Sequence, residues 1–105
     1  MVHLIDVRVT SKDKRLAKKV VNRINQKFLL QAGFCKEAKI YPFRPVKKLK
    51  RTEDGEAVIA QFHIKTHGGK KEISLILERL RDLEQVVCKE IKGDYTITVR
   101  PPGRE

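Results

Sequence analysis

The chain has 105 residues, of which 40% are hydrophobic and 35% are charged, and its formal net charge is +11 at pH 7. A chain of this length forms one domain and can bury a hydrophobic core without metal ions or disulfides. No apolar run approaches the roughly 20 residues of a bilayer-spanning helix. The first ten residues also lack the pattern of a signal peptide, so we expect a cytoplasmic protein without a membrane span.

The first third of the chain predicts a strand followed by a helix. Residues 3–10 alternate between apolar and polar side chains, which is typical of a half-buried strand. Residues 12–31 carry apolar side chains at helical spacing, with Ser11 as the expected N-cap, Asp13 in the first turn and Gly33 as the expected stop. The apolar positions of this helix are Ala17, Val20, Val21, Ile24 and Phe28.

The middle of the chain predicts two strands joined by a hairpin. One strand is expected over residues 35–43, at a sheet edge or bent, because Pro42 cannot donate to a strand ladder. Asp54-Gly55 is a hairpin turn signal, and residues 56–66 alternate as the partner strand. The inward face of that strand is expected to hold Val58, Ala60, Phe62 and Ile64.

The last third predicts a helix and two strands. Residues 67–84 indicate a loop and then a helix with the apolar stripe Ile73, Ile76, Leu77, Leu80 and Leu83. Residues 85–100 indicate two strands around a turn at residues 92–94, and residues 100–105 indicate a flexible tail. The element order predicts a single α+β domain over residues 1–105. Its expected plan is the ferredoxin-like split βαββαβ antiparallel sheet with two helices on one face, plus an extra C-terminal strand.

Positive charge is concentrated in the first half of the chain. Residues 1–51 hold fifteen Lys and Arg against three acids, a net of +12, whereas residues 52–105 hold nine against ten, a net of −1. Such a concentration indicates a surface that faces a polyanion. A first basic group follows 3–4 spacing on the predicted helix and consists of Lys12, Arg15, Lys19 and Arg23, with Lys27 continuing it. A second lies at or near the predicted hairpin and consists of Arg44, Lys47, Lys48, Lys50 and Arg51.

We predict that these nine Lys and Arg side chains, without Lys27, bind the phosphates of RNA or DNA; whether the two groups share one face stays open. Each group also has a simpler interpretation as a solvated surface. Tyr41 and Phe43 can stack on bases beside the second group, although packing in a core or interface is the more common role for such rings. The central predicted strands lack exposed rings, so we expect backbone and shape recognition rather than base stacking on the sheet. Residues 67–71, with two glycines and two lysines before a helix, suit either an anion nest or a flexible loop entry.

We expect a non-enzyme without a catalytic, metal or cofactor site. His63 and His67 are four residues apart, but a strand end and a loop separate them, which excludes metal ligation from one helix face. None of the common hydrolase, metalloprotease or phosphate-loop motifs occurs, and a nuclease is a minor alternative. Cys35 and Cys88 lie far apart and are expected to be reduced, mostly buried thiols, with a single disulfide as the alternative.

Short motifs over about residues 5–66 carry a family resemblance. They are Thr10-Ser11, Ala17, Ile40-Tyr41-Pro42 and Ile64-Lys65-Thr66. These motifs resemble the CutA family, small ferredoxin-like proteins that form trimers and are linked to divalent-cation tolerance. The chain departs from that family by an insertion between Ala17 and Pro42 and by the absence of its His-Pro-Tyr motif and last helix, so no metal ligand is transferred. The resemblance implies an oligomer in which edge strands and hairpin arms pair between subunits.

The sequence therefore predicts a small, basic, non-catalytic module that binds RNA or DNA through phosphate contacts and forms a homo-oligomer, a dimer or trimer. The alternative is a CutA-like oligomeric regulatory protein that binds a small anion or a metal between its subunits.

Overall fold

The computed structural model describes residues 2–41 and 49–103, apart from the side chain of Leu29. Within these ranges, four strands form one antiparallel sheet in the order β2-β3-β1-β4, and three helices accompany it. The strands are β1 (His3–Ser11), β2 (Leu49–Arg51), β3 (Val58–Thr66) and β4 (Thr96–Arg100). The helices are α1 (Lys14–Leu29), α2 (Ala32–Glu37) and α3 (Lys70–Glu90).

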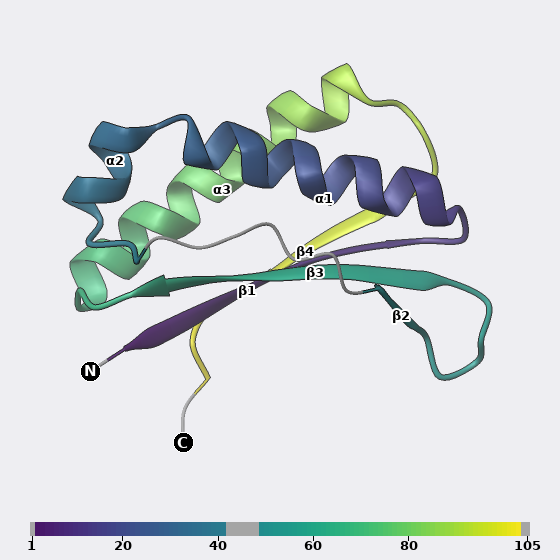
Figure 1. The fold of residues 1–105 in the computed structure, drawn as a ribbon, viewed down its shortest axis with the longest axis horizontal. Helices are drawn as coiled ribbons and strands as arrows, with labels where there is room; N and C mark the ends of the chain where they lie inside the picture. The colour runs from purple at the N-terminus through teal and green to yellow at the C-terminus, as the bar shows by residue number, and fades with distance from the viewer. Residues whose placement is uncertain (1, 42–48, 104–105) are drawn as a thin grey trace.

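The two long helices, α1 and α3, lie on the same face of the sheet, and no described helix covers the opposite face (Figure 1). We call that opposite face the open face. The expected α+β class, the antiparallel sheet and the placement of two helices on one face are confirmed. The arrangement is compatible with the ferredoxin-like plan.

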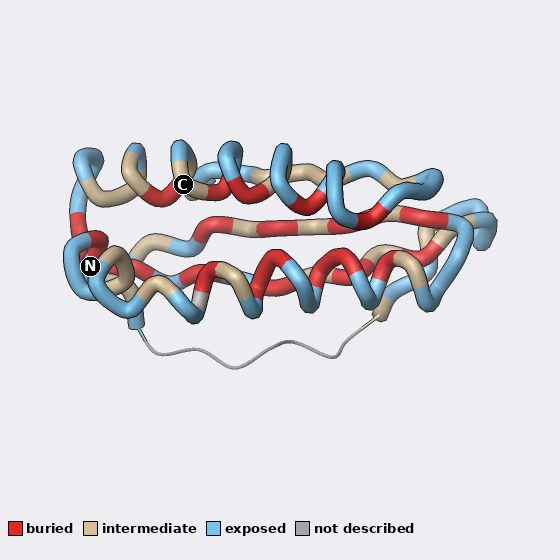
Figure 2. Tube along the Cα trace, turned by 90° about the horizontal axis from the view of Figure 1, so that it is seen from above, coloured by how far each residue is buried: buried red, intermediate tan, exposed pale blue. Residues whose placement is uncertain are grey.

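The core lies between the helices and the inward side chains of β1 and β3. Because side chains alternate along a strand, Ile5, Val7 and Val9 of β1 all point under the helices, where each is fully buried. Figure 2 shows buried residues recurring once per turn along the long helices, as a one-sided apolar stripe requires. The predicted core positions of α1 and β3 are confirmed as buried, namely Ala17, Val20, Val21, Ile24, Phe28, Val58, Ala60, Phe62 and Ile64.

The N-cap of helix α1 lies two residues later than predicted. Asp13, not Ser11, is the N-cap, and its Oδ1 accepts hydrogen bonds from the backbone N–H groups of Arg15 at 3.0 Å and Leu16 at 3.3 Å. The Ser11 hydroxyl accepts a bond from the Asp13 backbone N–H at 3.1 Å and donates to the backbone carbonyl of Asp94 at 2.8 Å. Ser11 therefore ties the start of α1 to the segment that leads into β4.

The strand expected over residues 35–43 is wrong. Residues 32–37 form the short helix α2, so Gly33 lies inside a helix and does not end α1. Two contacts of Phe34 hold this short helix against the rest of the fold. Its ring meets the ring of Phe28 edge-on, with centroids 5.7 Å apart, and the guanidinium of Arg79 lies 4.6 Å above its centroid. Only Ile40 makes a described strand-like pairing, an isolated bridge to Thr66. Residues 42 and 43 lie outside the described residues.

The extra C-terminal strand is also wrong. Residues 85–90 continue α3, because Leu83, Val87 and Ile91 extend its apolar stripe at 4-residue spacing and all three are buried. Only residues 96–100 of the predicted pair form a strand, and Arg100 is the last residue of β4 rather than the start of a tail.

The predicted hairpin at Asp54-Gly55 is confirmed. β2 and β3 pair antiparallel, and the Thr52 backbone N–H donates to the Ala57 carbonyl at 3.0 Å across the turn. Gly55 has a φ of +72°, a left-handed conformation that glycine adopts without steric cost. The strand that enters the turn is short and begins at Leu49, inside the basic stretch.

The Thr66 hydroxyl joins three segments at the end of β3. The side chain is fully buried, donates to the backbone carbonyls of Ala38 at 2.7 Å and Lys39 at 3.1 Å, and accepts from the Gly68 backbone N–H at 3.0 Å. It therefore holds the end of α2 against the start of the loop that leads into α3.

We expect Thr66→Val to lower the free energy of unfolding by about 1–3 kcal/mol, because it leaves these buried backbone groups without their partner. Chemical denaturation measures the change. Thr98→Val, on the open face of β4, is the matched control and should change stability by at most about 0.5 kcal/mol. Equal effects of the two substitutions would show that the Thr66 bonds do not hold this corner of the fold.

Candidate nucleic-acid interface

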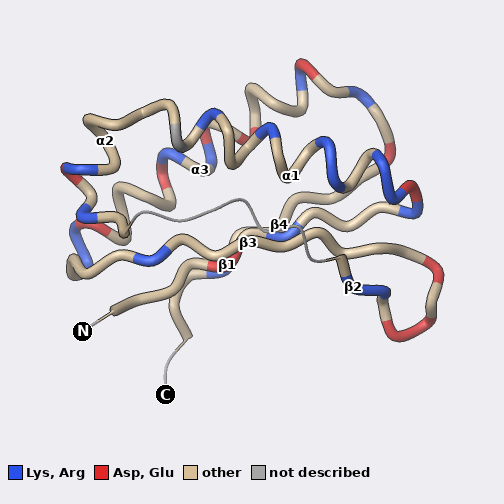
Figure 3. The backbone as a smooth tube through the Cα atoms, viewed as in Figure 1, with Lys and Arg blue, Asp and Glu red and all other residues tan. Residues whose placement is uncertain are grey.

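The first predicted basic group is exposed along the outer side of α1. Arg15, Lys19 and Arg23 are four residues apart on the helix, and Lys12 precedes its first turn; we call these four the α1 row. Figure 3 shows the cationic positions recurring along α1. None of the four forms an ion pair with an acid in the described parts of the chain. Their positive charge is therefore free to face solvent or an anion.

Lys27 differs from the α1 row. Its Nζ lies 2.9 Å from a carboxylate oxygen of Glu90 at the end of α3, so this lysine faces the neighbouring helix and its charge is compensated. The pair also marks which flank of α1 faces α3.

The second predicted basic group is only partly described. Lys50 and Arg51 are exposed on β2, whereas Arg44, Lys47 and Lys48 lie outside the described residues. The register places Arg51 opposite the inward-facing Val58 and Lys50 opposite Ile59, which alternates outward. Arg51 therefore lies on the helix side of the sheet and Lys50 on the open face. Because Lys50 and Arg51 face opposite sides of the sheet, the α1 row cannot form one continuous surface with both of them.

Two lysines that sequence reasoning left out lie on the flank of α1 nearest β2. α1 packs against β1, β3 and α3, whereas α3 packs against α1 and β4, so the flank of α1 away from α3 lies toward the β2 edge. At 100° per residue, Lys14 and Lys18 lie about 140° and 180° around the axis from Lys27. Both are exposed. Helical spacing alone could not select them, because it does not say which flank faces the hairpin.

Acidic side chains border the basic surface at the hairpin turn. Glu53, Asp54 and Glu56 are exposed there. Hydrogen bonds from the Thr52 hydroxyl and from the Glu56 backbone N–H lower the pKa of Asp54, and the nearby charge of Lys12 lowers it further. Figure 1 shows the turn between β2 and β3 at the same end of the molecule as the N-terminal end of α1. We therefore expect the acids of the turn to border the α1 row on its Lys12 side.

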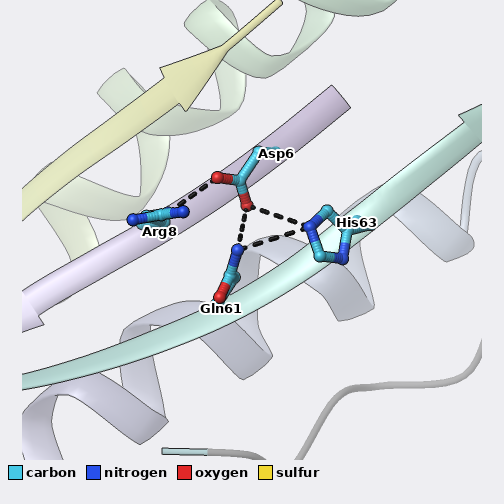
Figure 4. A network of polar contacts seen from close by, with 4 residues as sticks. All are labelled: Asp6, Arg8, Gln61 and His63. Atoms are coloured by element: carbon cyan, nitrogen blue, oxygen red, sulfur yellow. Dashed lines mark hydrogen bonds and ion pairs between the residues drawn. The ribbon is translucent and has the colours of Figure 1, made fainter. Parts of the chain in front are cut away.

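A polar network lies on the open face at the pairing of β1 with β3 (Figure 4). Asp6 accepts from Arg8 Nε at 2.6 Å and from Gln61 Nε2 at 2.7 Å, and its Oδ1 lies 3.4 Å from His63 Nε2. Gln61 Nε2 and His63 Nε2 are 3.3 Å apart. Asp6 is the one acid on the described strands of the open face, and the network surrounds its charge with donors. The arrangement fixes Arg8, Gln61 and His63 in place; that the protein is not an enzyme stays a prediction.

At the start of α3, where the sequence suits an anion nest, the carboxylate of Glu72 already takes the place of an external anion. Glu72 Oε1 accepts from the Gly69 backbone N–H at 2.9 Å, and Lys39 Nζ lies 3.8 Å from the same oxygen. A Cβ on Gly68 would lie 2.3 Å from Glu72 Cγ, so glycine is required for this close approach. An anion at this nest would have to displace Glu72, and the geometry favours the loop-entry interpretation.

The two cysteines differ in their surroundings. Both are free; Cys35 is half-buried, and burial raises the pKa of its thiol. Cys88 is exposed, which corrects the expectation that both thiols are mostly buried. In residues 2–41 and 49–103, no three His, Cys, Asp or Glu side chains gather closely enough to hold a metal ion. No helix in these ranges combines the length and the apolar character that a membrane span needs.

Comparisons with known proteins inform the fold alone. No protein-family model matches the sequence, and no curated protein matches it. The chain is similar in structure to the de novo designed protein Foldit4, with a TM-score of 0.55 and 13% identity over 100% of both chains. The CutA resemblance and the expected oligomer therefore stay predictions.

We expect Asp6→Ala to lower the free energy of unfolding by about 1 kcal/mol, because Arg8 and Gln61 lose their shared acceptor while water still reaches both. Chemical denaturation measures it, with Thr10→Ala, on the same strand and face, as the control. An Asp6→Ala variant no less stable than the control would show that the network does not contribute to the pairing of β1 with β3.

Tyr95 supplies a prediction on pH dependence. Burial, together with the neighbouring Cys88, raises the pKa of Tyr95 to about 12, and its hydroxyl donates to the Ile91 carbonyl at 2.5 Å. The folded state favours the neutral phenol, so this stabilisation is complete below the unfolded pKa of about 10 and is lost as the pH rises from there to about 12. Titration of phenolate absorbance should show a late component that disappears in Tyr95→Phe. A wild-type curve with both tyrosines complete near their ordinary value of about 10 would contradict the prediction.

Proposed function

We propose that this protein is a small, basic, non-catalytic module on a ferredoxin-like plan that binds RNA or DNA through phosphate contacts. The observation that carries the proposal is the α1 row, which presents four exposed cations and no ion pair to any described acid. Lys14 and Lys18 extend the same exposed surface toward the β2 edge.

Charge balance within the chain supports this proposal over a merely solvated helix. Among the described Lys and Arg side chains, only Arg8, Lys27 and Lys39 pair with a carboxylate. Neighbouring like charges on one helix repel each other, and a polyanion relieves that repulsion while its counterions are released. Such binding is electrostatic and fixes position rather than sequence.

The spacing of the α1 row suits a phosphate backbone. Successive members from Arg15 to Arg23 are one helical turn apart, about 6 Å along the axis. Long, flexible Lys and Arg side chains at this spacing can reach successive phosphates without fixed geometry. The acidic hairpin turn limits the contact at the Lys12 end.

The test is a salt titration of binding to a duplex. Relative to wild type, we expect the triple variant Arg15→Gln, Lys19→Gln, Arg23→Gln to reduce the slope of log affinity against log salt by about 2–3, since each lost phosphate contact removes about 0.9. Fluorescence anisotropy with labelled RNA and DNA duplexes measures it.

The matched control removes three exposed cations elsewhere, at Arg81, Lys89 and Lys92, on α3 and the turn that follows it. If the two triple variants lose slope equally, only net charge matters and the α1 row is not the site. Wild-type protein that fails to bind duplex or single strands at low salt would refute the proposed function.

A further inference from the structure

Two exposed aromatic rings meet at one corner of the open face. The rings of Tyr41 and His67 lie 4.4 Å apart between centroids and are inclined by 49°. Tyr41 is 36% exposed and His67 is exposed too, so the ring pair is accessible to a ligand. Neither residue belongs to a strand or helix. Tyr41 is one of the two rings that the sequence predicts can stack on bases, and His67 is its partner in the structure.

Backbone pairing sets the direction of both rings. The bridge of Ile40 with Thr66 points both residues toward the core, so the next residues, Tyr41 and His67, alternate to the open side. The Tyr41 backbone N–H donates to the Lys65 carbonyl at 2.8 Å, and the His67 N–H donates to the Lys39 carbonyl at 3.1 Å. The ring pair therefore stands on a hydrogen-bonded backbone rather than on an unsupported loop.

Basic side chains lead from the ring pair across the open face. Lys65 lies beside Tyr41, and Arg100 lies across from Asp6 in the register. Asp6 is the register partner of both Arg100 and residue 63, which is two residues from Lys65 on β3, so Lys65 and Arg100 are offset by about 7 Å along the strand direction. The only described acid on these strands, Asp6, already accepts from Arg8 and Gln61.

We propose that the open face binds a single-stranded segment of RNA or DNA, with one base stacked on the Tyr41–His67 pair and its flanking phosphates on Lys65 and Arg100. An aromatic pair beside a track of cations matches how proteins hold single strands, where bases are free to stack and the backbone follows the positive charge. A duplex keeps its bases paired and offers none to the rings. This inference rests on the proposed function and adds the strandedness of the nucleic acid and a second surface for it.

The experiment measures the affinity of the full chain for four probes at one low salt concentration: single-stranded RNA, single-stranded DNA and the two matching duplexes. Tyr41→Ala should weaken binding to the single strands by about 5- to 150-fold and leave binding to the duplexes unchanged. Tyr41→Phe keeps the ring and should stay within about twofold of wild type for every probe. The α1 triple variant should weaken binding to all four probes.

His67→Ala and Lys65→Gln provide independent readings on the same surface, and thermal unfolding checks that each variant is folded. Both should weaken single-strand binding more than duplex binding. A higher affinity for single-stranded RNA than for single-stranded DNA would indicate additional contacts to the 2′-hydroxyl. Equal affinities would indicate that only the base and the phosphates are recognised, and the proposal holds in both cases.

Two results would overturn the inference and separate it from the proposed function. If Tyr41→Ala and His67→Ala leave single-strand binding intact while the α1 triple variant weakens it, the open face is not the site and phosphate binding by α1 stands. If both ring variants weaken duplex and single-strand binding alike, the rings do not stack on a free base. Wild-type protein without affinity for any probe ends both proposals.

Discussion

The antiparallel pairing of β1 with β3 determines which side chains lie under the helices and which lie on the open face. The two strands pair over nine positions from His3 with Thr66 to Ser11 with Val58. Because side chains alternate, the register that buries Val7 and Phe62 under the helices also brings Asp6 beside His63 on the open face. A slip by one residue would exchange the two sets and expose the core, so the same hydrophobic constraint that specifies the fold also positions the polar network.

The charge distribution opposes the stability of the fold. A formal net charge of +11 on 105 residues implies self-repulsion, which favours expanded states of the chain. The described structure compensates little of it, since three Lys or Arg side chains pair with acids. The compact state must therefore depend on the apolar core between α1, α3 and the sheet. An anionic partner of the kind proposed here would relieve this repulsion.

Sequence patterns predicted correctly those elements in which the periodicity of apolar residues and the length of the segment indicate the same secondary structure. They failed where contacts with distant parts of the chain determine the secondary structure. The stripes of α1 and β3 were clear because all of their predicted inward positions are buried. Val86 and Val87 favour a strand locally, but the helical spacing of Leu83, Val87 and Ile91 in the core prevailed. Residues 32–37 became a helix because Phe34 packs between Phe28 and Arg79, two contacts that no local pattern reveals. Likewise, the strand register was needed to show that Lys50 and Arg51 face opposite sides of the sheet. The Tyr41–His67 pair joins residues that are distant in the sequence, so no local pattern predicts it.

Within the described residues, the β2 edge offers a route by which the two proposed surfaces can act together. The α1 row and the open face lie on opposite sides of the sheet, so a straight duplex can contact only one of them (Figure 1). At β2, alternation turns Arg51 toward the helix side and Lys50 toward the open face, and Lys14 and Lys18 lie on the flank of α1 toward this edge. A flexible single strand can follow positive charge around the edge, whereas a stiff duplex cannot bend so sharply without a large deformation energy. If the proposed function holds, we therefore expect a single strand to reach more phosphates on this protein than a duplex can.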